Sequence, residues 1–335
     1  MRLLAYNLAL ILATLAGLAG CGDRKEGPGA PAKQVRLGYF ANLTHAQAVL
    51  GVASGEFEKA VAPAKFSTKT FNAGPSLVEA LFAKQIDIGY IGPGPAITAH
   101  VRSRGEGVRV IAGASSNGVL IVARKDSGIN TLADLKDKRI ATPQLANTQD
   151  IAARHYLLKQ LKQANLNNVL PIANAEQLAM MQRGQIDAAW APEPWATRLI
   201  VEAGGKAVAE EKDLWPNKQV TLALIITTPE FLRDNPELVE KFLRVHTSWT
   251  KRLAEDPQKQ VPQLGEGVKA LTGKSLPPGV LDQAIKNVTF TDDPLAETLS
   301  TMAQWSHELG FAKEKPNLDG LVDLTILKKV QGSRP

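Results

Sequence analysis

Short apolar segments of strand length alternate with longer helical segments along most of this chain, and this alternation limits the possible folds more than any other feature. Predicted strands are Val35–Phe40, Lys65–Phe71, Asp87–Ile91, Val108–Ala114, Val119–Arg124, Arg139–Thr142, Val169–Ile172, Asp187–Trp190 and Val220–Thr227. Predicted helices begin near Ala46 and span Ser76–Lys84, Pro95–Arg104, Thr148–Gln163, Ala175–Arg183 and Pro194–Ala203. This pattern predicts an α/β fold with parallel sheets covered by helices on both faces. Beyond residue 227 the chain is predicted to be helical, with breaks at prolines and glycines.

One segment of the chain occurs twice in similar form, one hundred positions apart. QIDIGYIGPGPA occupies 85–96 and QIDAAWAPEPWA occupies 185–196, so Asp87 matches Asp187 and Tyr90 matches Trp190. Each copy ends a helix, forms a short strand and continues into a proline-rich turn. Two ordinary βα units that are alike by coincidence would also give this pattern, but the shared positions favour two similarly built lobes. Ligands of open α/β sheets bind beyond the carboxyl ends of the strands, so the two turns are predicted to grip one small molecule from both sides.

The first twenty residues have the features of a secretory signal. A basic start at Arg2 precedes a largely apolar run that ends in small residues. The run stops at Leu18-Ala-Gly-Cys21, which resembles the lipobox of bacterial lipoproteins, where the cysteine is acylated and the preceding peptide is removed. Cys21 is the only cysteine of the chain, so an internal disulfide is impossible. The alternative is a cysteine without a role, but its uniqueness and position favour lipidation.

A polar stretch rich in glycine and proline follows the cysteine. Residues 21–34 are therefore predicted to be a lipidated flexible tether between the membrane and a folded body. Removing residues 1–20 takes away one of the 39 basic residues, which leaves 39 − 1 = 38 against 33 acidic residues and a net charge of +5. No long basic run is present, so we expect no nucleic-acid partner. The remaining residues are enough for two cores.

Three segments have the residue spacing of a capping box, and each stands near the carboxyl end of a predicted strand. They are Thr44 to Gln47, Ser76 to Glu79 and the variant Asn147 to Asp150. Such boxes mark helix starts, and a helix N-terminus attracts anions through its free N–H groups and partial positive charge. Most capping boxes only stabilise helices. Their shared position at the predicted cleft favours an anion site that needs no lysine or arginine.

The chain resembles the solute-binding proteins of ABC importers in the nitrate/sulfonate/taurine family. The resemblance rests on VRLGYFANLTHAQAV (35–49), DIGYIGPGPAI (87–97), TLADLKDKRIATPQLANTQDIAARHYL (131–157) and AAWAPEPWATRLI (188–200), and extends to about residue 230. It implies a type II periplasmic-binding-protein fold, with two doubly wound α/β lobes joined by a two-strand hinge. We place the crossings near 122–127 and 219–227. Lobe one is then 35–122 plus 221–335, and lobe two is 123–220.

Candidate ligand-binding residues come from the loops that follow the predicted strands. Glycine lets the backbone approach a ligand closely, hydroxyl and amide side chains offer neutral hydrogen bonds, and Trp195 offers an aromatic face. The first loop is included because matching loops of the family reach the ligand. The candidates are Asn42, Leu43, Thr44, His45, Gly92, Pro93, Gly94, Ser115, Ser116, Gln144, Asn147, Thr148, Gln149, Glu193 and Trp195.

Glu193 fits an anion site poorly, because a desolvated carboxylate repels a desolvated anion. Either it holds a hinge or backbone partner, or the ligand also carries an ammonium group, as taurine does. Members of the family with different ligands share this Glu-Pro-Trp element, which favours a structural role.

No catalytic motif of the common hydrolase, P-loop or metalloprotease types is present, and the five histidines are scattered. We therefore expect no enzyme activity, no cofactor and no metal. Thiamine-pyrimidine synthases share the fold but depend on a cysteine-rich segment that this chain lacks.

The predicted function is capture of a small organic anion and its delivery to a permease. The resemblance implies partners in an ABC permease and its ATPase, and a monomeric protein in the periplasm or at the cell surface, anchored to a bacterial membrane through Cys21. An aliphatic sulfonate or taurine-like compound is the first choice of ligand, with nitrate next. A binding protein for a neutral pyrimidine or thiamine precursor, or a subunit that presents its ligand to a sensor, are the alternatives.

Overall fold

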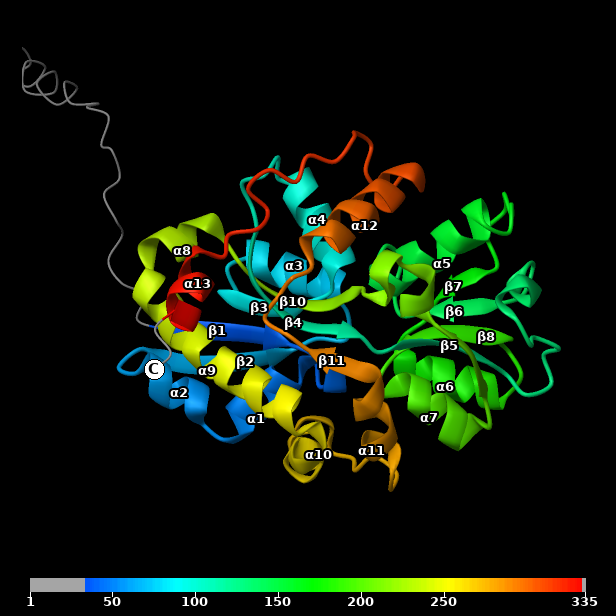
Figure 1. Ribbon diagram of the computed structural model, residues 1–335, viewed down its shortest axis with the longest axis horizontal. Coiled ribbons are helices and arrows are strands. Elements are labelled where there is room, and N and C mark those ends of the chain that lie inside the picture. Colours follow the sequence, from blue (N-terminus) through cyan, green and yellow to red (C-terminus); the bar gives the residue numbers. More distant parts are fainter. Residues whose placement is uncertain (1–33, 333–335) are drawn as a thin grey trace, which may run out of the picture. The chain divides into compact units, whose positions relative to one another are not determined.

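The computed structural model describes residues 34–332, which contain two β-sheets, each covered by helices on both faces (Figure 1). The predicted signal, Cys21 and nearly all of the predicted tether lie outside the described residues. No helix among residues 34–332 combines the length and the apolar character needed to cross a membrane.

The first sheet has six strands in the order β11-β4-β10-β3-β1-β2. Their bounds are β1 Gln34–Tyr39, β2 Lys65–Thr70, β3 Ile88–Ile91, β4 Arg109–Asn117, β10 Thr221–Thr227 and β11 Val288–Phe290. Strand β1 pairs in parallel with β2 and β3, as the strand–helix alternation predicts. Strand β10 is antiparallel to both β3 and β4, so the sheet is mixed and not wholly parallel. The cause is the returning chain, which enters the sheet from the opposite end.

The second sheet has five strands in the order β7-β6-β8-β5-β9. Their bounds are β5 Val119–Ala123, β6 Ile140–Thr142, β7 Val169–Pro171, β8 Ala188–Pro192 and β9 Lys206–Glu210. Strands β6, β7 and β8 are parallel, whereas β5 is antiparallel to β8 and β9. Both sheets therefore share one plan, in which three parallel strands are followed by an inserted antiparallel strand.

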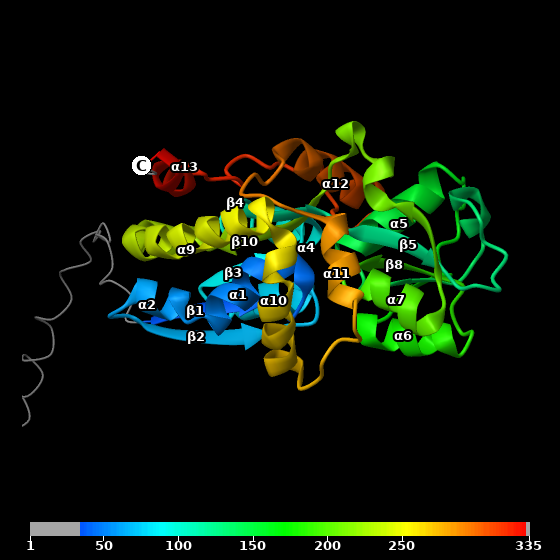
Figure 2. The same ribbon diagram turned by 60° about the horizontal axis from the view of Figure 1, so that its bottom comes forward.

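Helices on both faces of the first sheet bury its alternating apolar residues. One face carries α1 Ala46–Ala53, α2 Glu56–Val61 and α9 Pro236–Glu255, and the other carries α3 Gly74–Phe82, α4 Pro93–Arg102 and α12 Ala296–Glu308 (Figures 1 and 2). Along β10, Ala223 and Ile225 join the first core and Leu224 and Ile226 the second, because successive side chains of a strand point to opposite faces.

The second sheet is covered in the same manner. Helix α5 Thr148–Lys159 packs on one face, and α6 Asn174–Gln182 with α7 Trp195–Ala203 packs on the other. Residues 119, 121 and 123 of β5 face α5, and residues 120 and 122 face the other pair. Four helices complete the C-terminal part: α8 Pro229–Asp234, α10 Pro257–Thr272, α11 Val280–Ala284 and α13 Thr325–Gly332. Of these, α11 packs against α7 (Figure 2).

The repeated Gln-Ile-Asp segment has the same structural role in both sheets. Asp87 accepts hydrogen bonds from the backbone N–H of Arg36 (2.8 Å) and from its guanidinium, which also donates to the carbonyl oxygen of Lys84. Asp187 accepts the same bonds from the backbone N–H (3.0 Å) and guanidinium of Arg139, which donates to the carbonyl oxygen of Gly184. Arg139 holds the pKa of Asp187 well below its usual range, and Arg124 assists. Each aspartate thus ties the start of one strand to that of its parallel neighbour.

The chain leaves the first sheet earlier than the sequence predicts. Strand β5 pairs with β8 and β9 along its full length, so residues 119–122 belong to the second sheet and the passage lies at Asn117 and Gly118. Both of these residues have a positive φ, 61° and 74°, which lets the backbone turn sharply between two strands that are almost continuous in sequence. The return lies between the end of β9 at Glu210 and the start of β10 at Thr221.

Two strands and two helix starts differ from prediction. Strand β9 was not foreseen, and β11 lies in the predicted helical tail, where it pairs with β4. Helix α3 begins at Gly74, before Ser76, and no side chain caps it. Thr44 lies inside a 3-10 turn, Leu43–His45, which runs directly into α1. It therefore does not stand before a helix start with free N–H groups. The third predicted cap is present, because the Asn147 side chain accepts a hydrogen bond from the backbone N–H of Asp150 (2.9 Å).

Candidate functional site

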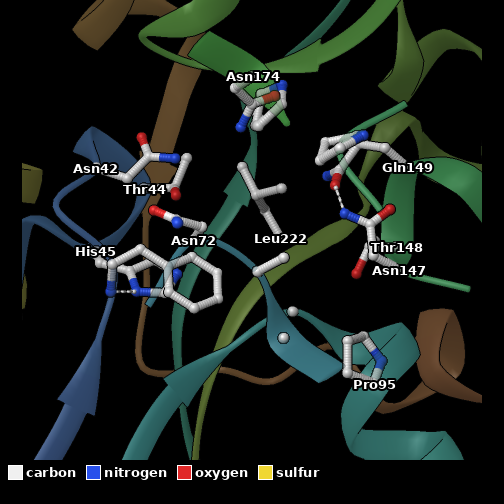
Figure 3. A pocket seen from close by; sticks show the side chains of 16 residues that line it. Asn42, Thr44, His45, Asn72, Pro95, Asn147, Thr148, Gln149, Asn174 and Leu222 are labelled. Carbon is white, nitrogen blue, oxygen red and sulfur yellow. Dashed lines mark hydrogen bonds between the residues drawn. The ribbon is translucent and has the colours of Figure 1, made fainter. Parts of the chain in front are cut away.

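A small cavity lies where loops from both sheets meet (Figure 3). About 440 Å³ near it is free of protein atoms and partly open to solvent, and the space for the centres of water-sized molecules is about 40 Å³. The lining residues come mainly from strand ends and the helix starts that follow them. They are Phe40, Asn42, Thr44, His45, Asn72, Ala73, Gly74, Gly92, Pro95, Pro143, Asn147, Thr148, Gln149, Asn174, Pro192 and Leu222.

Four α-helix N-termini stand at this cavity. Helix α3 begins at Gly74, Gly92 is the N-cap residue of α4, α5 begins at Thr148 and α6 at Asn174. Each of these helices has at least eight residues. The first N–H groups of a helix have no partner within it and carry the positive end of its dipole. The converging helix starts therefore give the cavity a positive potential.

No lysine, arginine, aspartate or glutamate is among the described residues that line the cavity. His45 is neutral as well, because complete burial lowers its pKa to about 3. Its Nδ1 accepts a hydrogen bond from the backbone N–H of Phe40 (3.1 Å), so the single proton of the neutral ring is on Nε2. The ring stacks on Phe40 with centroids 4.3 Å apart. Attraction for an anion would thus come from dipoles and N–H donors and not from charged side chains.

Amide side chains surround the space from several directions. Figure 3 shows Asn42 and Asn72 on one side, Asn147 and Gln149 on the other, and Asn174 above them. Asn147 donates to Gln149 Oε1 (3.2 Å). Among residues 34–332, Asn42 Oδ1 and Asn174 Oδ1 are buried and have no hydrogen-bond partner. Buried polar atoms are nearly always paired, so these two point to a missing ligand or water.

The two halves of the site touch at the turn after β3. Thr148, the first residue of α5, accepts a hydrogen bond on Oγ1 from the backbone N–H of Gly94 (3.3 Å). A Cβ atom added at Gly92 would lie 2.4 Å from the same Oγ1. The glycine turn therefore lets the first half of the site approach the second closely.

Seven of the fifteen predicted ligand residues line the cavity, and they come from both halves. They are Asn42, Thr44, His45, Gly92, Asn147, Thr148 and Gln149. The repeated turns do meet here, but the second turn contributes Pro192 to the wall and not Trp195.

The other eight predicted residues lie elsewhere. Leu43 is part of the first core, and Ser115 donates to the carbonyl oxygen of Thr44 (2.9 Å) beneath the first loop. Gly94 lies two residues after Gly92 and contacts Thr148. Trp195 faces a separate groove beside α10. The remaining residues do not line the cavity: Pro93, Ser116, Gln144 and Glu193.

Glu193 takes the structural role that its sequence context favours. Its buried carboxylate accepts hydrogen bonds from the backbone N–H (3.0 Å) and hydroxyl (2.9 Å) of Thr197 and from Asn287 Nδ2 (2.7 Å). Burial raises its pKa despite these bonds. Its backbone N–H donates to the carbonyl oxygen of Gly118 (2.9 Å), at the passage between the sheets. Because Asn287 stands just before β11 of the first sheet, Glu193 ties the second sheet to the first at the crossing.

Nine lining residues were not predicted. Some of them stand directly beyond the carboxyl ends of parallel strands, the position from which the other lining residues were predicted. Asn72 follows β2, and Asn174 follows β7 closely, so both stand beyond the carboxyl ends of parallel strands. Leu222 comes from the antiparallel strand β10, to which this reasoning does not apply. The other missed residues are Phe40, Ala73, Gly74, Pro95, Pro143 and Pro192.

Comparison with known proteins places this chain in a family. The profile of the NMT1-like family matches residues 28–262. A protein of Bacillus subtilis (strain 168) described as a putative aliphatic sulfonates-binding protein is 22% identical over 96% of each chain. The taurine-binding periplasmic protein of Escherichia coli (strain K12) is 26% identical over 66% of this chain and 68% of its own.

A solved structure shares the fold. It is the alkanesulfonate-binding protein SsuA of Xanthomonas axonopodis pv. citri bound to MOPS, which matches with a TM-score of 0.68 and 20% identity. The match covers 90% of this chain and 99% of the other. The type II periplasmic-binding-protein fold predicted from the sequence is thereby confirmed.

Proposed function

The chain belongs to the NMT1-like family, and we propose that it is the extracytoplasmic solute-binding component of an ABC importer, which captures a small organic anion. The observation that carries this proposal is the cavity at which four helix N-termini converge without a carboxylate in its wall. Such a cavity is attractive to an anion and leaves the ligand free of a strong ion pair, so that it can be released.

The mechanism is capture by closure of two lobes, each built on one of the two sheets. An open form exposes the two half-sites, and a ligand that contacts both shifts the equilibrium toward the closed form. The contact of Gly94 with Thr148 belongs to that closed form, whereas the Glu193–Asn287 bond lies at the crossing of the chain. Closed lobes then dock on a permease, and ATP is hydrolysed by another subunit. No bond of the ligand is made or broken.

An aliphatic sulfonate or a taurine-like compound is the ligand that suits the cavity best. Sulfonate oxygens would accept hydrogen bonds from helix N–H groups and from Nε2–H of His45. The free amide oxygens of Asn42 and Asn174 would accept a hydrogen bond from an ammonium group, as in taurine. Nitrate also offers three oxygen acceptors, in a planar arrangement and a smaller volume.

A neutral pyrimidine-like heterocycle is the alternative, and one observation favours it. The wall is uncharged, and the stacked rings of Phe40 and His45 give it an aromatic surface among amides. A subunit that presents its ligand to a sensor would use the same cavity. A neighbouring gene for a permease and ATPase supports import, and one for a sensor kinase supports signalling.

Calorimetry with the purified chain decides between these ligand classes. We expect heat of binding and a rise in melting temperature with alkanesulfonates or taurine, and a weaker response to nitrate. Neutral pyrimidines serve as the opposing panel, because they share the size but not the charge. Binding of a pyrimidine with no response to any sulfonate or nitrate would replace the anion by the heterocycle.

We also propose that Cys21 carries the lipid anchor of the mature protein. The support is its position after Leu18-Ala-Gly at the end of the apolar run. Mass spectrometry of the membrane fraction should find an acylated N-terminal peptide that begins at Cys21, and Cys21→Ser should abolish it. A mature N-terminus at another residue without lipid would contradict this proposal.

A further inference from the structure

A larger groove lies beside the cavity and has no part in the function proposed so far. Trp195 and Arg198 of α7 form one wall, and Val268, Leu276 and Pro277 form the facing one. Measured as space for the centres of water-sized molecules, it has about 590 Å³, compared with about 40 Å³ in the cavity. A molecule with an extended tail therefore finds room in the groove that the cavity does not offer.

Residues that line the groove and residues that line the cavity adjoin on three separate segments of the chain. Ala41 lines the groove and the next residue, Asn42, lines the cavity. In the same way, Ala175 lines the groove and the preceding residue, Asn174, lines the cavity. In the turn after β8, Pro192 lines the cavity and the residues from Pro194 onward line the groove. Consecutive Cα atoms are about 3.8 Å apart, so the walls of the two spaces adjoin at the first two places, and only Glu193 separates them at the third.

The polar atoms at this border lack partners. Asn42 is only 6% exposed, and its Oδ1, like that of Asn174, accepts no hydrogen bond from any described residue. Figure 3 shows both side chains at the edge of the cavity. A ligand that passed from the cavity to the groove would run between these two amides.

The groove itself favours an apolar tail. The indole of Trp195 is half-buried and is held in place by the guanidinium of Arg198, which lies 4.4 Å from the ring centroid. Glu202 fixes that guanidinium through an ion pair one turn further along α7. Val268, Leu276 and Pro277 line the same groove, beside the polar Thr272, Lys274 and Ser275, so a ring or a chain of several carbons would find apolar contacts besides the indole.

We propose that this groove is the tail subsite of the same binding site, and that the ligand is an organic sulfonate with an extended apolar tail. This inference rests on the proposed function. The cavity has room for a head group of a few heavy atoms, since a single water molecule needs about 10–15 Å³ of such space. The tail then lies along Trp195, which becomes a specificity-determining residue.

Titration of two sulfonates that differ only in their tails tests the subsite. We expect 3-phenylpropane-1-sulfonate to bind the purified chain at least tenfold more tightly than methanesulfonate. Trp195→Ala should remove most of that difference and leave the affinity for methanesulfonate unchanged, whereas Trp195→Phe should keep about half or more of the gain. Val201→Ala is the matched control, because Val201 lies on the same helix and is 46% exposed.

The outcomes separate the subsite from the head-group site. If the two sulfonates bind equally, or if Trp195→Ala weakens both alike, the tail subsite is refuted and the proposed function stands. If neither sulfonate binds, the sulfonate proposed as ligand is refuted and the subsite with it, and the wider panel of taurine, nitrate and pyrimidines then tests the proposed function. A loss of folding in Trp195→Ala would show in its melting curve, and Trp195→Phe then decides the matter alone.

Discussion

Gly92→Ala should weaken ligand binding about 5- to 150-fold and leave both halves of the chain folded. The backbone of Gly92 has φ −74° and ψ 157°, which any residue adopts, so alanine causes no strain of its own. Its Cβ would stand 2.4 Å from Thr148 Oγ1, and the other nearest atoms are at ordinary distances of 3.5 and 3.6 Å. The clash arises only when α5 closes on the turn, so closure should lose about 1–3 kcal/mol. Calorimetry with the best-binding sulfonate measures this loss.

A second substitution should reverse the effect of the first. Thr148→Ala removes the clashing oxygen, together with the hydrogen bond from Gly94, and costs some affinity by itself. In the double variant, the added methyl group at position 92 should cost almost nothing more, so the two losses should not add. Gly265→Ala is the control, because a Cβ atom there meets only Leu281 at 3.4 Å. If the two losses simply add, the methyl group at position 92 does not clash with Thr148 when α5 closes on the turn.

The repeat in the sequence predicted more of the fold than any single residue did. Asp87 and Asp187 hold equivalent arginines, and Tyr90 and Trp190 are both fully buried in equivalent strands. These features were predictable because strand period and burial are local properties of the sequence. The resemblance placed β10 in the first half of the fold, but its place between β3 and β4 and its antiparallel direction were not predictable, because they depend on where the returning chain enters the sheet.

The predicted site was partly right for the same reason. Residues directly after parallel strands, such as Asn42 and Gly92, line the cavity because strand direction fixes their position. Prediction failed at Ser76 because helix α3 begins earlier, at Gly74. It also failed at Trp195, whose side chain lines the neighbouring groove and not the cavity. The direction of a side chain at a turn depends on backbone angles that the spacing of residues does not encode.

Glu211→Gln should remove a loss of stability that the native chain undergoes between about pH 4.5 and pH 7. Glu211 is fully buried at the start of the return segment, where it accepts hydrogen bonds from the indole N–H groups of Trp190 (2.6 Å) and Trp215 (3.2 Å). Burial raises its pKa from 4.5 to about 7. The folded state therefore holds a proton that the unfolded state releases above pH 4.5, and the free energy of unfolding falls as pH rises toward 7. At 1.36 kcal/mol per pH unit, the fall from this group is roughly 3 kcal/mol.

The difference between native and variant chains isolates this contribution, because His45 acts in the opposite direction. Its pKa of about 3 makes stability rise as pH increases from 3 to 6.5, and this rise is common to both chains. Glutamine offers one acceptor oxygen to two indole donors, so the variant should be less stable than the native chain at pH 4.5 and lose that disadvantage by pH 8. Urea unfolding from pH 4.5 to 8 measures both curves. Glu210→Gln, at the neighbouring partly exposed carboxylate, is the control and should leave the slope unchanged. A constant gap between the native and Glu211→Gln curves would mean that burial does not raise the pKa of Glu211 above its value in the unfolded chain.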